Sequence, residues 1–180
     1  MPSDTMASDT MAGDIPMRQA SPPPPQGHYV PARRHNDLVF VSGMTPRRNG
    51  VLLHAGQVAV DAPAELYEEA VQLATGNALQ AAEAQLRNGE WIASVLSLTV
   101  YVNAPPGFTR HSQIADMASR HIQDCIHAAL PSRAAIGVAS LPGNATVEIS
   151  MIVGLGSDVE NDNKNGDFDS FIIKYYEKAW

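Results

Sequence analysis

The chain has little cysteine, few basic residues and no long apolar run. Cys125 is the only cysteine among 180 residues, so no disulfide can form within the chain, and an oxidising compartment is not indicated. No segment approaches the roughly 20 apolar residues of a membrane helix, and the N-terminus lacks a charged start followed by an apolar stretch. We therefore expect a soluble, cytoplasmic protein without a membrane partner.

Basic charge is scarce as well, with 12 Lys and Arg against 19 Asp and Glu. The excess acid lies mainly at the two ends, because residues 27–155 hold ten acidic residues against eight arginines. A nearly neutral domain argues against a phosphate-binding surface. Two arginine doublets, Arg33-Arg34 and Arg47-Arg48, could form a local basic patch, but no aromatic residues are interleaved with them. We read them as solvated arginines and expect no nucleic-acid partner.

Composition divides the chain into three parts. Residues 1–26 contain the pentapeptide Ser-Asp-Thr-Met-Ala twice and a run of four prolines, which is typical of a disordered arm. Residues 27–155 have the composition of one globular domain. Residues 156–180 form an acidic linker and an apolar tail whose partner the sequence does not identify. Within it, residues 161–169 loosely resemble a calcium loop, but Ile172 stands where the bidentate Glu belongs, so we expect no metal.

Hydrophobic periodicity predicts an α+β domain between these ends. The pattern gives strands at 37–42, 51–54 and 93–102, helices at 61–88 and 109–129, and two final strands at 133–140 and 146–153. Pro142-Gly143-Asn144 supplies turn chemistry between the last two strands, and we interpret them as a β-hairpin. This order favours a mixed sheet with two helices on one face. The other face is expected to mediate association with further copies.

Arg133 and Glu148 are isolated charges in the two final strands. Glu148 alternates with Val147 and Ile149, so its side chain should point to the opposite face of the sheet. Isolated charges in strands are costly unless they are paired, exposed or used on a ligand. From spacing alone, a structural ion pair at a sheet edge is as good an interpretation as a binding site.

Other titratable residues show no pattern of a site. His111 and Cys125 lie on the apolar stripe of the second predicted helix, so we interpret both as buried packing residues. The remaining histidines have no metal-ligand spacing. The sequence contains neither a glycine-rich phosphate loop nor a nucleophile elbow. We therefore expect neither a metal nor an organic cofactor.

Several segments, taken together and in order, resemble the RidA/YjgF family of enamine and imine deaminases. They are Gly27-His28-Tyr29-Val30-Pro31-Ala32, Leu38-Val39-Phe40-Val41-Ser42-Gly43, Thr99-Val100-Tyr101-Val102, Pro131-Ser132-Arg133-Ala134-Ala135, Leu141-Pro142 and Val147-Glu148-Ile149. The resemblance covers residues 27–155. It implies a chorismate-mutase-like fold, a homotrimer with pockets between subunits, and hydrolysis of 2-aminoacrylate-like compounds to 2-keto acids and ammonia, without a cofactor.

By motif, Arg133 is similar to the carboxylate-binding arginine of that family and Glu148 to its water-activating carboxylate. Tyr29 and Ser42 stand where the family has pocket-lining hydroxyls, and Gly43 and Ala135 occupy substrate-binding positions. The resemblance thus implies a small-molecule substrate with a carboxylate group as the expected partner.

The pocket departs from the family pattern at three places. Met44 replaces the usual Gln, Ala135 replaces a small or thiol residue, and Pro106 lies in a loop that commonly offers an asparagine. A non-catalytic trimeric module that binds a small carboxylate therefore stays an alternative. Ribonuclease or RNA-binding activity, which is attributed to some relatives, is a weaker one.

Overall fold

The computed structural model describes residues 24–158. The repeat, with the disorder expected of it, and the apolar tail lie outside this range. The elements follow in the order β1 (Ala32–His35), β2 (Leu38–Met44), β3 (Arg47–Arg48), β4 (Val51–Leu52), a 3-10 turn η1 (Ala64–Tyr67), α1 (Glu68–Glu83), β5 (Glu90–Asn103), α2 (His111–Ile126), β6 (Ser132–Val138), a second 3-10 turn η2 (Pro142–Asn144) and β7 (Val147–Ser157).

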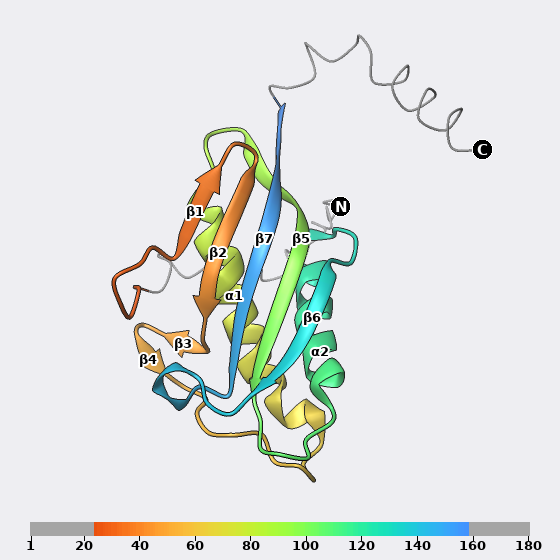
Figure 1. Cartoon of the computed structure of the whole chain (residues 1–180). Helices are drawn as coiled ribbons and strands as arrows, with labels where there is room; N and C mark the ends of the chain where they lie inside the picture. The colour runs from red at the N-terminus through yellow and green to blue at the C-terminus, as the bar shows by residue number, and fades with distance from the viewer. Residues whose placement is uncertain (1–23, 159–180) are drawn as a thin grey trace, which may run out of the picture.

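Five strands form one mixed sheet in the order β1-β2-β7-β5-β6, and β3 and β4 form a separate two-stranded ribbon. Both helices lie on the same side of this sheet, α1 behind β2 and β7 and α2 behind β5 and β6 (Figure 1). The α+β class and the two helices on one face are therefore confirmed. The opposite side of the sheet carries no helix in the described chain, and we call it the open face.

The predicted hairpin of the last two strands is wrong. Strand β5 lies between β6 and β7, pairing parallel with β6 and antiparallel with β7. The chain from β5 through α2 to β6 is a crossover connection, which returns a strand in the parallel direction. After β6 the chain turns through Gly143 and Asn144, both at positive φ, and β7 then enters the middle of the sheet. Turn residues therefore indicated a reversal of the chain but not which strand would be the neighbour.

Other boundaries shift in smaller ways. Strands β1 and β3 were not predicted from the sequence. The first helix begins later than expected, because Pro63 starts a 3-10 turn before α1. The second helix ends at Ile126, ahead of Pro131, because the next residue, His127, adopts a left-handed conformation with φ of 51°. The prediction that His111 and Cys125 are both buried is wrong, since Cys125 is exposed and His111 is only half-buried.

The core lies between the helices and the sheet. Alternate residues in the middle of the central strands are completely buried there, including Leu98 and Val100 from β5 and Val147 and Ile149 from β7. The apolar stripe of α1 packs on them through Val71, Ala74 and Ala78. Among residues 24–158, no helix is long and apolar enough to cross a membrane.

Candidate active site

Glu148 lies on the open face of β7. Its neighbours Val147 and Ile149 are completely buried toward the helices, whereas Glu148 is half-buried, so strand alternation points its side chain the other way. Burial raises the pKa of this carboxyl above its usual value. No ion pair of residues 24–158 involves Glu148. A carboxyl group that is partly desolvated and lacks a cationic partner is suited to accept and return protons.

Gly43 provides the space that the Glu148 carboxylate occupies. A β-carbon at Gly43 would overlap Oε1 of Glu148 and would lie 2.5 Å from its Cδ. The pairing of β2 with β7 slips between Val41 and Met44, where β2 holds one more residue than β7. This β-bulge, a feature often found beside active sites, brings the side-chain-free backbone of Gly43 to the carboxylate.

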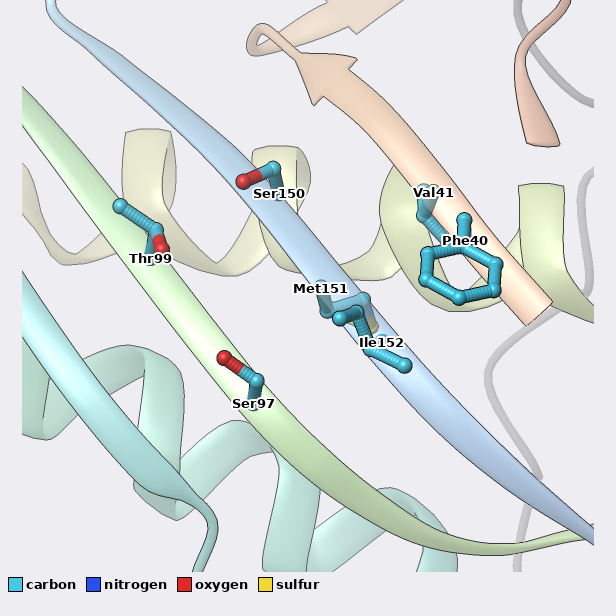
Figure 2. A pocket seen from close by; sticks show the side chains of 7 residues that line it. All are labelled: Phe40, Val41, Ser97, Thr99, Ser150, Met151 and Ile152. Atoms are coloured by element: carbon cyan, nitrogen blue, oxygen red, sulfur yellow. The ribbon is translucent and has the colours of Figure 1, made fainter. Parts of the chain in front are cut away.

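Polar side chains continue from Glu148 along the open face. Tyr101 pairs with Glu148 across β5 and β7, and Thr99 pairs in the same way with Ser150. Beyond them a shallow hollow of about 140 Å³ is lined by Phe40, Val41, Ser97, Thr99, Ser150, Met151 and Ile152. Figure 2 shows the three hydroxyls on the two adjacent strands, with the Phe40 ring across from them on β2. The open face thus presents hydroxyls and apolar groups beside one carboxylate.

Ser42 and Tyr29 are close to each other in the fold, but only the Tyr29 side chain is free to contact a ligand. The Ser42 hydroxyl donates to the carbonyl of Val30 at 2.8 Å, and its amide donates to the carbonyl of Pro31 at 2.9 Å. Ser42 therefore anchors the segment that carries Tyr29. The Tyr29 side chain remains substantially exposed, and its hydroxyl accepts a long bond from the amide of Gln26 at 3.4 Å.

Arg133 lies on the helix side of edge strand β6. Its Nη1 donates to Asp116 Oδ1 at 2.8 Å and to Ser119 Oγ at 2.9 Å, both on α2. The side chain is only 21% exposed, so the guanidinium is held in a narrow place between strand and helix. Ala135, two residues further along, points to the same side and packs against the core.

The structure therefore does not bring Arg133 and Glu148 together within one chain. They lie on opposite faces of the sheet, with β5 between their strands. Along β5, Arg133 is level with Leu98 and Glu148 with Tyr101, which adds about 10 Å of offset at the usual rise per residue. Of the six residues predicted for the site, Glu148 and Gly43 are in contact and Ser42 adjoins them. Tyr29, Arg133 and Ala135 are not shown to reach the carboxylate.

Sequence reasoning missed the residues that surround these two groups. The alternation of β5 did place Thr99 and Tyr101 on one face, but only the register with β7 shows that they flank Glu148. Asp116 and Ser119 are three residues apart on α2, on one helix side, yet nothing in the sequence connected them with Arg133. Within residues 24–158, no three His, Cys, Asp or Glu side chains are placed to hold a metal ion.

A larger hollow lies far from these groups, beside the turn between β1 and β2. It has a volume of about 580 Å³ and is lined by Arg34, Asn36, Asp37 and Arg87. The Arg34 guanidinium there is already occupied by the Glu90 carboxylate and two backbone carbonyls. We interpret this region as a structural tie between β1 and the start of β5.

Comparison with known proteins identifies the class to which this fold and these residues belong. Residues 19–155 match the model of the family described as Endoribonuclease L-PSP. The chain belongs to this family, which is also known as the RidA/YjgF family.

Individual relatives agree with this assignment. The Trypanosoma cruzi protein TCP17 is 27% identical over 135 residues, which are 74% of this chain and 84% of that protein. The Agrobacterium tumefaciens protein Atu1372 is 33% identical with a TM-score of 0.66, over 72% of this chain and 82% of the other. E. coli TdcF, solved with bound serine, and E. coli YjgF are 22% and 21% identical, both with a TM-score of 0.54 over 73% of this chain and 91% of theirs. At that identity they support the fold alone.

Proposed function

We propose that the protein hydrolyses 2-aminoacrylate-like enamines and imines to 2-keto acids and ammonia. The observation that carries the proposal is the Glu148 carboxyl, half-buried beside Gly43, with a raised pKa and no cationic partner in the described chain. Such a group can take a proton from water near neutral pH and give it back. E. coli TdcF was solved with bound serine, which supports a small amino-acid-like ligand.

In this proposal Arg133 binds the substrate carboxylate. A guanidinium keeps its charge at all working pH values and offers parallel N–H groups that match a carboxylate. Binding at that end orients the C=N group of the imine tautomer relative to a water molecule.

Glu148 then takes part in the chemical step. It accepts a proton as the water oxygen bonds to the imine carbon, which gives a carbinolamine. Glu148 returns that proton to the nitrogen, which makes the carbinolamine neutral. It then takes the hydroxyl proton as the C=O bond forms and passes it to the nitrogen as the C–N bond breaks, so that ammonia leaves.

A pocket that contains both Arg133 and Glu148 would need a second copy, because the two residues lie on opposite faces of the sheet. If one pocket contains both groups, Arg133 must come from one subunit and Glu148 from its neighbour. Edge strand β6 has the exposed side chains for such a contact, and the open face has exposed apolar residues such as Phe40 and Leu96. We propose a homotrimer with closed symmetry, which gives three equivalent pockets.

The direct test measures ammonia release from 2-aminoacrylate formed in the assay by a serine dehydratase. Purified protein should accelerate the release, and Arg133→Ala and Glu148→Gln should abolish the acceleration. Arg120→Ala and Glu65→Gln are matched controls, because both side chains are exposed and belong to neither half of the site. Equal rates for wild type and Arg133→Ala would refute the proposal.

Mixing the two inactive variants tests whether the pocket is shared. Subunits of Arg133→Ala and Glu148→Gln, unfolded and refolded together at equal amounts, should recover about a quarter of wild-type activity, since one interface in four then has both native groups. Recovery is expected only if the two groups come from different copies. No recovery, with trimers shown to exchange subunits, would contradict the shared pocket.

Two other functions make different predictions. A non-catalytic carboxylate-binding module would show Arg133-dependent binding in calorimetry without turnover. The family description favours ribonuclease activity as a further candidate; it predicts RNA affinity that falls steeply with salt. A flat salt response would remove it.

A further inference from the structure

The proposed carboxylate-binding residue, Arg133, is not free in the folded chain. Its Nη1 atom carries two N–H groups, and these point to the Asp116 carboxylate at 2.8 Å and to the Ser119 hydroxyl at 2.9 Å. Ser119 is buried and Asp116 is half-exposed. Two side chains from one helix therefore occupy one end of the guanidinium.

We propose that Asp116 is a positioning residue, which orients Arg133 for the substrate carboxylate. This inference rests on the proposed function. The other edge of the guanidinium, formed by Nε and the second amino nitrogen Nη2, has no partner among the described residues. These two atoms present parallel N–H groups, the arrangement that binds a carboxylate through two hydrogen bonds. Asp116 and Ser119 thus hold Arg133 from behind and leave its binding edge available.

Orientation matters at this place because an arginine side chain has several rotatable bonds. Without partners the guanidinium would have to be immobilised when substrate binds, which costs binding free energy. Asp116 holds it before binding. The carboxylate of Asp116 also lowers the positive potential at Arg133, so its charge and its hydrogen bond act in opposite directions on substrate affinity.

These opposite effects distinguish a residue that positions Arg133 from one that competes with the substrate carboxylate for it. Asp116→Ala removes both the hydrogen bond and the charge, whereas Asp116→Asn keeps an acceptor oxygen and removes only the charge. Positioning predicts that Asp116→Ala weakens carboxylate binding about tenfold, the scale of one lost charge-assisted hydrogen bond. It predicts that Asp116→Asn binds at least as tightly as wild type. The matched control is Asp124→Ala, an exposed residue further along α2 without a contact to Arg133 in the described chain.

The experiment measures pyruvate binding by calorimetry and the KM and kcat for 2-aminoacrylate with the full-length protein. We expect Asp116→Ala to raise KM and the pyruvate dissociation constant together, with a smaller change in kcat and with rescue by Asp116→Asn. Unchanged or tighter binding of Asp116→Ala would overturn the inference, as would failure of Asp116→Asn to restore affinity. A wrong proposed function would give a different result, because Arg133→Ala and wild type would then have the same activity. In that case this inference fails as well.

Discussion

Replacement of Gly43 by Ala tests whether the Glu148 carboxylate must occupy the place where the structure has it. The new β-carbon would lie 2.5 Å from Cδ and 3.0 Å from Cγ of Glu148. Carbon atoms in contact are separated by about 3.5 Å or more, so the carboxylate has to move by about 1 Å. A displacement of that size at a reacting group can lower the rate about 100-fold, which corresponds to about 2.7 kcal/mol in activation free energy.

The same substitution should leave the fold intact. Gly43 does not have a positive φ, so alanine is compatible with its backbone, and replacing a strand glycine changes the free energy of unfolding by about 1 kcal/mol or less. We therefore expect a large loss in kcat for 2-aminoacrylate with a nearly unchanged urea midpoint. Activity within twofold of wild type would refute the assignment of Glu148 as the proton acceptor at this position.

Gly76→Ala is the matched control for this prediction. It is the same chemical change in the middle of α1, where the added β-carbon would be 3.7 Å from His121 Nε2, an ordinary contact. The helix lies on the other side of the sheet from Glu148. We expect full activity and a gain of about 1 kcal/mol in stability. Equal losses of activity in both variants would mean that Gly43→Ala acts through the fold and not through the carboxylate.

Three further predictions concern pH and packing. Glu148→Gln should be inactive yet more stable than wild type at neutral pH, because the raised pKa of Glu148 means that folding is disfavoured as pH rises and the carboxyl ionises; melting curves at several pH values test this. A hydrogen bond from Arg34, together with one from the Arg87 amide, lowers the pKa of Glu90 to about 2. Glu90→Gln should therefore be less stable than wild type above about pH 4.3, and this difference in stability should shrink as pH falls toward 2. Leu98→Ala, at a fully buried site, should cost about 2 to 5 kcal/mol in urea unfolding.

Local patterns were sufficient for the class of fold. The apolar stripe of α1 and the alternation around Glu148 appear in the sequence because burial imposes a period on each element. The neighbours of each strand are set by contacts between distant segments. For that reason the sequence predicted a hairpin of β6 and β7, and the structure instead inserts β5 between them. Cys125 shows the same limit, since a residue on an apolar stripe near a helix end remains exposed.

The site was predictable only in part, and for a related reason. Residue type and resemblance singled out Arg133 and Glu148, because isolated charges in strands are unusual. Their surroundings depend on how the strands pair. Tyr101 lies beside Glu148 because of the register between β5 and β7, and Gly43 does so because of the bulge where β2 pairs with β7. Asp116 meets Arg133 only through the packing of α2 on β6. No local pattern in the sequence records such contacts.

The separation of the two charged groups by β5 links the proposed activity to assembly. Strand β6 is an edge strand, and four residues beside Arg133 on it are exposed: Ser132, Ala134, Ile136 and Gly137. An edge strand with unpaired backbone groups and small side chains favours pairing with another chain, and this edge carries Arg133. A contact there could join the guanidinium of one copy to the open face of the next. Because only the assembled form would then have a complete pocket, specific activity should fall on dilution below the dissociation constant of the assembly.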